Sequence, residues 1–256
     1  MQRHSPNGLA YYTFDSLPVP HAISTRHGGI SPAPFHSLNL SISTGDNPNN
    51  VTANIARLHS ALALDESATV SASQAQADHI AIVNADNRGM RIQNVDALVT
   101  NTPALPLLLR YADCVPIFFY DPARRAIGVA HAGWRGTVAK IAAKTVQAMQ
   151  NAFGTRVKDV CACIAPSIGP CCYKVGDDVI TQVRAVFDRA DELLVKRSGS
   201  THLDLWQANA IQLRELGVER IEIAEICTAD HTDDFYSWRK ENKNTGRFGA
   251  IIALPS

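Results

Sequence analysis

A cysteine and a histidine at the ends of apolar, strand-like segments are the side chains best suited to chemistry. Cys114 follows Asp113 where the apolar run 105–120 is interrupted, and His131 ends the apolar run that starts at Ile127. If the strand that ends at Asp113 and the strand that starts near Ile127 are antiparallel neighbours, both side chains lie at one end of a sheet. Cysteine and neutral histidine bind zinc together, and histidine also activates a thiol for nucleophilic attack. The pair alone leaves a metal site, a thiol site and a packed core pair all open.

Charged and aromatic residues collect on two loops that are punctuated by glycine and proline. Residues 24–40 (STRHGGISPAPFHSLNL) contain Arg26, and the glycine-flanked turn after His131 contains Trp134 and Arg135. Catalytic groups often lie on such loops, at the ends of rigid elements. Ion pairs and packing against the core are the other common roles of these side chains.

Hydrophobic periodicity and capping residues predict the elements that position these loops. Asn50 and Asp204 are the expected N-caps of two of the helices. The predicted helices are 51–64, 137–154, about 176–190 and 204–216, and the predicted strands are two within 105–120, then 127–131, 159–165, 220–227 and 248–254. The two strands within 105–120 are interpreted as a hairpin broken at 112–114. The pattern is typical of an α/β (α+β) fold with mixed sheets flanked by helices, and it leaves the strand order undetermined.

Length alone allows one or two domains, and the absence of a linker favours a single domain over residues 1–256. The chain is 46% hydrophobic and 19% charged, a composition that excludes wholesale disorder. Its 24 basic and 24 acidic residues cancel, so its net charge gives no basis for non-specific binding to nucleic acid or to a membrane surface. No apolar run approaches the roughly 20 residues of a membrane helix, and the first 20 residues lack the apolar core of a secretion signal. No linker divides the chain. We therefore expect a cytoplasmic protein.

Four of the six cysteines are crowded into one stretch, at Cys161, Cys163, Cys171 and Cys172. Six cysteines are too few for a disulfide scaffold in a chain of this length. A C-x-C sequence followed by an adjacent pair is not the ligand spacing of a structural zinc site. The four are therefore expected to be small buried thiols on strands.

Long motifs spread from about residue 24 to residue 254 resemble those of the YfiH-type family. They read STRHGGIS, FHSLNL, GDNP, YADCVP, AHAGWRGT, PSIGPCCYKVG, CT and FYSWRKENKNTGR. Members of the family have been described as polyphenol oxidases (laccases), as purine nucleoside-cleaving enzymes and as peptidoglycan editing factors. The resemblance implies the family's layered single-domain fold and a surface pocket with a zinc ion on one cysteine and two histidines.

The resemblance places the family's cysteine on Cys114 and one of its histidines on His131. The second histidine normally lies in a Q-V-H-G motif, but this chain has Gln76 at that position. A glutamine carbonyl is a much poorer zinc ligand than an imidazole. Three arrangements remain open: a weakened zinc site lined by Gln76, a site rebuilt with His79, and a metal-free cysteine–histidine pair.

The resemblance also assigns substrate and cofactor. It implies a zinc-assisted purine nucleoside phosphorylase that accepts adenosine, inosine and methylthioadenosine and also deaminates adenosine. Arg26 is expected to act in catalysis by holding phosphate, with Trp134 and Arg135 at the substrate. The expected partners are small molecules (nucleoside and phosphate), with no nucleic acid and no membrane, and the chain is expected to be a monomer or a small homo-oligomer.

The sequence leaves three other functions open. A Cys–His amidohydrolase that edits peptidoglycan precursors would use Cys114 as nucleophile and His131 as base. A copper-dependent polyphenol oxidase fits less well, because type 1 copper needs two histidines and a cysteine and no multi-histidine cluster is present. A non-enzymatic binding module would follow if the missing ligand marks a decayed site.

Overall fold

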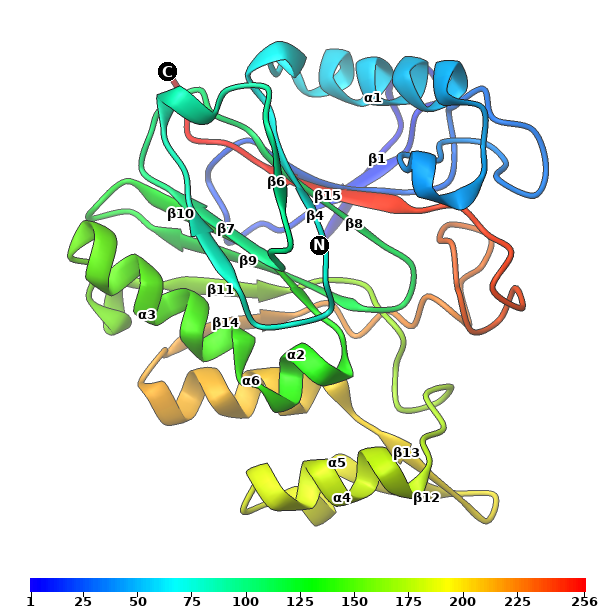
Figure 1. Cartoon of the computed structure of the whole chain (residues 1–256), viewed down its shortest axis with the longest axis vertical. Coiled ribbons are helices and arrows are strands. Elements are labelled where there is room, and N and C mark those ends of the chain that lie inside the picture. Colours follow the sequence, from blue (N-terminus) through cyan, green and yellow to red (C-terminus); the bar gives the residue numbers. More distant parts are fainter.

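Two mixed β-sheets pack face to face in the computed structural model, which describes all residues 1–256 (Figure 1). The first sheet has the order β1 (Gln2–His4), β2 (Tyr11–Thr13), β3 (His21–Ser24), β15 (Phe248–Ile252), β8 (Leu107–Tyr111), β4 (Val70–Ser73) and β6 (Arg91–Gln93). The second has the order β14 (Arg220–Ile223), β11 (Cys161–Ile164), β9 (Val115–Asp121), β10 (Ala126–Ala132), β7 (Ala97–Thr100) and β5 (Ile80–Ile82). A separate ribbon pairs β12 (Leu194–Arg197) with β13 (Ser200–Leu203).

Helices cover the outer faces of both sheets. They are α1 (Pro48–Leu62), α2 (Trp134–Val138), α3 (Ile141–Phe153), α4 (Asp177–Val186), α5 (Ala190–Leu193) and α6 (Leu205–Leu216). Figure 1 shows α1 over the first sheet and α2, α3 and α6 under the second, with α4, α5 and the ribbon at the far end. This is the mixed-sheet, helix-flanked α/β single domain that the sequence predicts. None of these helices combines the length and the apolar character that crossing a bilayer requires.

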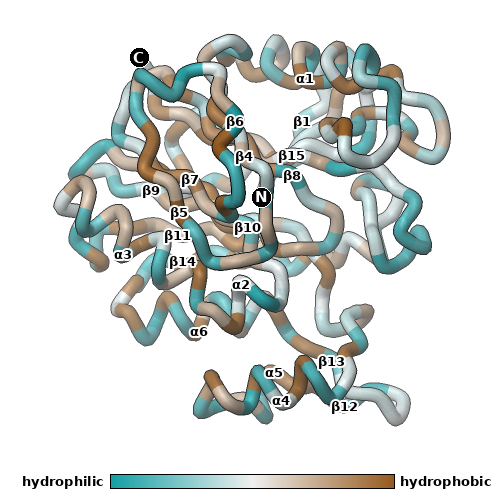
Figure 2. Tube along the Cα trace, viewed as in Figure 1, coloured by the Kyte–Doolittle hydropathy of each residue, from teal (hydrophilic) through white to brown (hydrophobic).

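Residues of β9 show why the second sheet lies in the middle of the molecule. Phe118 packs into the core between the sheets, whereas its neighbours Ile117 and Phe119 pack into the core under α3 and α6. Successive side chains on a strand point to opposite faces, so a strand that is covered on both faces has an unbroken apolar sequence. Figure 2 shows hydrophobic residues gathered along these central strands.

The apolar run 105–120 forms two strands, as predicted, but they are not a hairpin. β8 pairs with β15 and β4 in the first sheet, whereas β9 pairs with β10 and β11 in the second. The chain therefore crosses between the sheets at residues 112–114, where Asp113 has a left-handed backbone with φ 87°. Because this crossing lies at the end of both sheets, Cys114 is presented at their junction.

Two helices begin at residues other than the predicted ones. α1 starts at Pro48 instead of residue 51, because the Asn47 side chain accepts the N–H of Asn49 and proline suits the first helical turn. The predicted helix 137–154 is two helices, because Lys140 has a left-handed conformation with φ 62° that separates α2 from α3. As a result, Trp134 lies at the start of α2, directly after the strand that carries His131.

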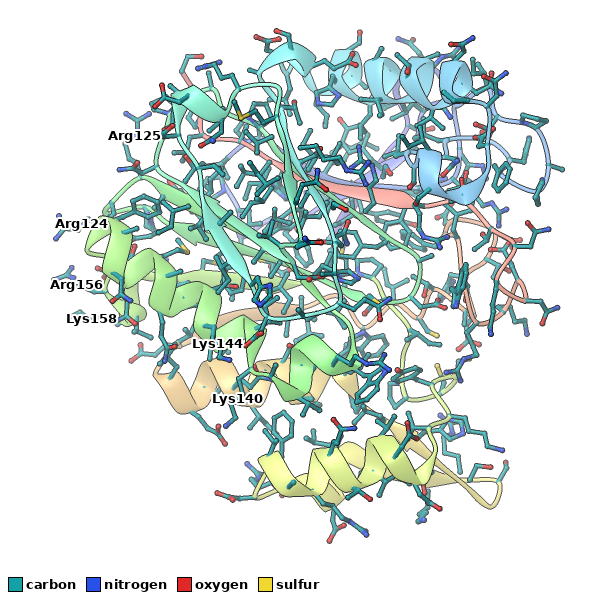
Figure 3. The ribbon with its side chains drawn as sticks, in the orientation of Figure 1. Arg124, Arg125, Lys140, Lys144, Arg156 and Lys158 are labelled. Carbon is teal, nitrogen blue, oxygen red and sulfur yellow. The ribbon has the colours of Figure 1, made fainter.

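Three basic side chains around α3 form ion pairs with acidic neighbours. Figure 3 shows them projecting outward from this side of the molecule. Lys144 pairs with Asp78, Arg156 Nε lies 2.6 Å from Asp159 Oδ2, and Lys140 Nζ lies 3.7 Å from a Glu215 carboxylate oxygen. This pairing contrasts with the arginines of the cavity described next.

Candidate active site

Cys114 and His131 converge at one end of the second sheet. β9 and β10 are antiparallel, with His131 opposite Pro116 and Ala132 opposite Val115, so both side chains lie at the same edge. Gly133 separates them from the chain that follows: a Cβ atom there would lie 3.2 Å from the Cys114 sulfur and 3.9 Å from His131 Cε1. The glycine therefore leaves the space that the pair occupies.

Asp96 fixes the orientation of the imidazole. This fully buried carboxylate lies 2.8 Å from His131 Nδ1 and also accepts the backbone N–H groups of Ala75, Gln76 and Ala77 at 2.9–3.0 Å. With Nδ1 bonded to Asp96, Nε2 is the ring nitrogen left for a ligand or a proton transfer. One buried side chain thus joins β7, the imidazole and the 75–77 loop.

Electrostatics couple the three groups. Burial lowers the pKa of His131, but the Cys114 thiolate and the Asp96 carboxylate raise it further, to about 9. Burial raises the pKa of Asp96, yet the bonds from His131 and the loop N–H groups outweigh it and hold that pKa below its ordinary value. A metal ion on His131 therefore has to displace a proton at neutral pH.

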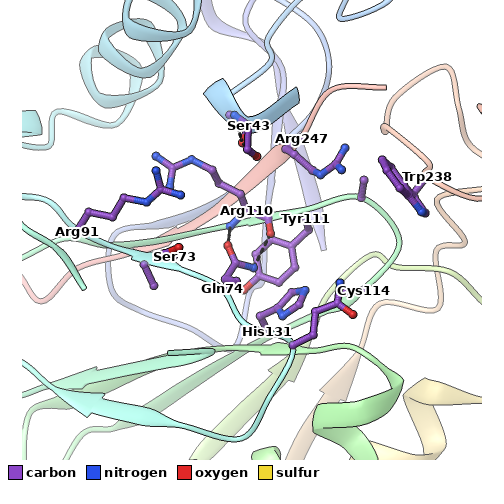
Figure 4. Close-up of a pocket in the computed structure, with 14 residues that line it drawn as sticks. Ser43, Ser73, Gln74, Arg91, Arg110, Tyr111, Cys114, His131, Trp238 and Arg247 are labelled. Atoms are coloured by element: carbon purple, nitrogen blue, oxygen red, sulfur yellow. Dashed lines mark hydrogen bonds between the residues drawn. The ribbon is translucent and has the colours of Figure 1, made fainter. Parts of the chain in front are cut away.

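A cavity of about 410 Å³ opens beside the pair and contains three arginines (Figure 4). Arg91, Arg110 and Arg247 line it, and no acidic residue does. Arg110 Nη1 is buried without a hydrogen-bond partner, while its Nε donates to the Leu40 carbonyl. Burial, and then the charge of Arg91, lower the pKa of Arg110 to about 10. An unpaired cationic cluster of this kind is suited to an oxyanion such as phosphate.

A second cavity, of about 200 Å³, lies on the other side of Cys114 and is more apolar. It is lined by aromatic rings from three parts of the chain, Trp134, Tyr173 and Trp238, and it shares Gln76 and Cys114 with the first cavity. The guanidinium of Arg247 lies 4.8 Å from the centre of the Trp238 ring, which is 42% exposed. The cysteine therefore lies between a cationic compartment and an aromatic one.

Asp113 holds the loop that presents Cys114. Its carboxylate accepts Thr228 Oγ1 at 2.8 Å and the Arg239 N–H at 2.6 Å, and its own carbonyl accepts the Ile168 N–H. Burial raises the pKa of Asp113. These bonds, together with its left-handed backbone, give the charged residue next to the thiol a positioning role.

The other residues proposed from the sequence lie outside the two cavities, with two exceptions. Trp134 lines the second cavity and Gln76 lines both. The Arg26 guanidinium is bound by Glu241 at 3.0 Å and by two backbone carbonyls, and Arg135 lies over the Trp134 ring instead of lining either cavity. His79 bonds the Asn94 carbonyl. The structure thus brings neither Arg26 nor His79 to the pair.

Comparison with known proteins identifies the fold as that of one family. A family model described as "Multi-copper polyphenol oxidoreductase laccase" matches residues 20–255. The chain belongs to this family, the YfiH-type proteins. It is 40% identical to a purine nucleoside phosphorylase of Deinococcus radiodurans, over 97% of this chain and 94% of that one, and 32% identical to purine nucleoside phosphorylase YfiH of Escherichia coli, over 90% and 92%.

Solved structures agree with this assignment. YlmD from Geobacillus stearothermophilus superposes with a TM-score of 0.92 at 33% identity, covering 99% of this YfiH-type chain and 98% of that one. The Bacillus licheniformis protein YfiH gives the same TM-score and identity, with 97% of each chain covered. The layered fold expected from the sequence motifs is thus confirmed.

The donor set of this YfiH-type site fits zinc through two strong ligands. Cys114 and His131 supply a thiolate and an imidazole, and the Asp96 bond to Nδ1 is the support that histidine ligands usually have. Gln76 contributes only an amide. Its backbone, held at φ 57° by the N–H bond to Asp96, brings this residue to the wall of both cavities.

Proposed function

We propose that this YfiH-type protein is a purine nucleoside phosphorylase. The observation that carries the proposal is the unpaired cluster of Arg91, Arg110 and Arg247 in the same cavity as Cys114 and His131. A phosphorolytic enzyme has to bind a phosphate oxyanion beside the substrate carbon that the phosphate attacks. The names of the relatives, purine nucleoside phosphorylases at 32–40% identity, support the same activity.

In the proposed reaction the arginines bind phosphate and direct one of its oxygens at C1′ of the ribose. The new C1′–O bond forms as the C1′–N9 bond breaks, and the bonding electrons leave with the purine, which takes up a proton. The products are ribose 1-phosphate and the free base. Positioning of the two reactants, along with charge neutralisation by the arginines, supplies the rate enhancement.

The purine is assigned to the second cavity, where Trp134, Tyr173 and Trp238 offer aromatic faces for stacking. Adenosine, inosine and methylthioadenosine share the purine and C1′, so all three are proposed substrates. Deamination of adenosine in the same pocket, in which water adds at C6 and ammonia leaves, is proposed as a second activity and is measured as released ammonia.

Cys114 and His131 are the residues that would hold zinc in this proposal, with Gln76 as a weak third contact. Bound zinc acts as a Lewis acid and lowers the pKa of a bound water. The chain's own part is to orient the ligands: Asp96 holds the imidazole, and Asp113 holds the loop of the thiol.

The arginine cluster makes a direct prediction about phosphate. Arg110→Gln should raise KM for phosphate at least tenfold, about 1.4 kcal/mol, because it removes a charged, bidentate donor, while KM for adenosine stays near the parent value. Initial rates of ribose 1-phosphate formation at varied phosphate measure this. Arg26→Gln is the matched control and should leave KM for phosphate unchanged. If Arg26→Gln raised that KM and Arg110→Gln did not, the phosphate site would be misplaced.

The departure at Gln76 makes a second prediction. Gln76→His should lower the zinc Kd at least tenfold, about 1.4 kcal/mol, because imidazole is a stronger zinc ligand than an amide oxygen. Histidine also tolerates the left-handed backbone of this position. Competition with a chromophoric chelator measures the Kd, and His79→Ala serves as the control that should not change it. An unchanged Kd in Gln76→His would exclude residue 76 from the metal site.

One observation favours a second candidate function. Thiol hydrolases use a nucleophilic thiol, a histidine base and an acid that orients the histidine, and Cys114, His131 and Asp96 match these three roles in space. An amidohydrolase acting on peptidoglycan precursors is therefore the alternative. Such an enzyme would keep its activity in chelator and lose it on alkylation of Cys114 by iodoacetamide. Copper-dependent polyphenol oxidation has less support, because His131 is the only histidine that lines either cavity.

A further inference from the structure

Four side chains with metal-binding atoms meet at a place that neither cavity includes in its lining. Cys171 and Cys172 lie in the turn between β11 and α4, and Cys227 and Asp230 lie in the segment after β14. Their three sulfur atoms and one carboxylate oxygen all lie within 4.8 Å of one another. This cysteine cluster differs from the sequence-based expectation: Cys171 and Cys172 are half-buried in a turn, whereas only the other two crowded cysteines are buried on a strand.

The backbone holds the cysteine cluster together from both sides. Ser167 donates to the Ile226 carbonyl at 3.1 Å and accepts the Thr228 N–H at 3.0 Å, which fixes the two segments on either side of Cys227. The Gly169 N–H donates to the Cys227 sulfur at 3.3 Å. Main-chain hydrogen bonds thus fix the relative positions of the two segments that carry the sulfur atoms, so these positions do not depend on flexible side chains alone.

The cysteine cluster contains acidic groups without a cation. No lysine, arginine or histidine forms an ion pair with Asp230, whose Oδ1 accepts the Cys172 thiol at 3.0 Å. The four donor groups therefore contact one another without an ion-pair partner from the rest of the chain.

We propose that Cys171, Cys172, Cys227 and Asp230 bind one zinc ion as a structural site. Thiolate sulfur is the ligand that zinc prefers in structural sites, and a carboxylate oxygen completes the four-coordinate set. Zinc–sulfur bonds of about 2.3 Å in a tetrahedron place sulfurs about 3.8 Å apart, so atoms that lie within 4.8 Å of one another need to draw together by at most about 1 Å. Four protein ligands leave no open position for substrate, which makes the site structural.

The zinc would join a segment that lines the second cavity to a segment that holds Asp113, another residue of its wall. Ile168 and Tyr173, just before and after the cysteine pair, line that cavity. Thr228, next to Cys227, holds Asp113 beside the reactive thiol. A bound ion therefore acts as a cross-link behind the active site and stabilises it without touching substrate.

The test uses full-length, untagged, reduced protein carrying Cys114→Ser, so that metal at the first site does not contribute. After loading with zinc and dialysis we expect near one zinc per chain, and three fewer thiols that react with a thiol reagent than in the metal-free protein. Cobalt in place of zinc should give the absorption bands of a tetrahedral, thiolate-ligated ion. Adding Cys227→Ser should remove the zinc, whereas adding the control Cys161→Ser, outside the cysteine cluster, should keep it.

Asp230→Asn covers the case in which Cys227→Ser does not fold, because Asp230 is exposed and its loss leaves the core intact. This variant should bind zinc at least tenfold more weakly than its parent. The proposal is overturned if the Cys114→Ser protein retains no zinc, if zinc persists undiminished in both cluster variants, or if the cluster cysteines form a disulfide, seen as a 2-dalton mass loss, instead of binding the ion.

Discussion

His131→Ala and Cys114→Ser should each lower kcat/KM for phosphorolysis of adenosine at least 1000-fold. Both side chains face one cavity from the same sheet edge, and the pKa of His131 responds to the Cys114 thiolate, so they act as one unit. Groups that act as a unit lose most of their effect when either is removed, so the double variant should be little worse than either single variant. Initial rates for the two single variants and the double variant measure this directly.

His79→Ala is the matched control for these variants. His79 is exposed, bonds the Asn94 carbonyl and lines neither cavity, so its loss should leave kcat/KM within about twofold of the parent. Thermal unfolding of each variant separates loss of chemistry from loss of fold. A His131→Ala protein with near-parental turnover would remove the pair from the reaction, and an inactive His79→Ala protein would mean that His79 had replaced the missing family histidine.

The meeting of Cys114 with His131 was predictable from sequence because it depends on local features. His131 lies on a strand that pairs with its neighbour in the chain, as neighbouring strands commonly do. That neighbour is β9, which starts just after Cys114, and not the strand that was expected to end at Asp113. The error over the hairpin has the same origin. Sequence periodicity shows that β8 and β9 are strands, but not that Phe248–Ile252, more than a hundred residues later, pairs with β8 and draws it into the other sheet.

The cationic cavity was not predictable, because its arginines come from distant places with no common motif. Arg91 lies on β6, Arg110 on β8 and Arg247 just before β15. Each arginine, taken alone, is typical of the polar end of a strand. Only the pairing of these strands shows that the three arginines line one cavity without an acidic residue. The resemblance to the family pointed instead to Arg26, which in the structure is bound to Glu241 away from the cavities.

The cysteine cluster illustrates the same limit. A spacing rule compares residues that are close in sequence, and by that rule the adjacent pair Cys171–Cys172 is an unsuitable ligand set. The partner that changes this interpretation, Cys227, follows 55 residues later and arrives through the parallel pairing of β14 with β11. Ligand sets assembled by sheet topology are invisible to a rule about spacing.

Asp96→Asn should weaken both stability and activity, although Asp96 touches no cavity. The carboxylate accepts four N–H groups, and asparagine offers one oxygen while turning an NH₂ group toward the remaining donors. Because buried donors are left unsatisfied, we expect a loss of about 3 kcal/mol in the free energy of unfolding, or roughly 10 °C in Tm. The misoriented imidazole should cost a further 10- to 100-fold in kcat/KM.

Asp121→Asn is the matched control for this variant. Asp121 is also fully buried and accepts two backbone N–H groups through Oδ1, but its Oδ2 has no partner, so an amide fits there without losing a bond. It should keep the parent's kcat/KM. If Asp96→Asn matched Asp121→Asn in Tm and turnover, Asp96 would have no role in holding the imidazole and its loop.

The pH dependence of stability tests whether the negative charge of Asp96 causes the expected loss of stability in Asp96→Asn. Its pKa in the folded protein lies below the ordinary value, so the ionised carboxylate stabilises the fold at neutral pH. That contribution is complete above the ordinary aspartate pKa of about 3.9 and is lost as the pH falls through the lower, folded value. The Tm difference between the parent and Asp96→Asn should therefore shrink as the pH falls below about 4, whereas loss of shape alone would leave it unchanged over that acidic range.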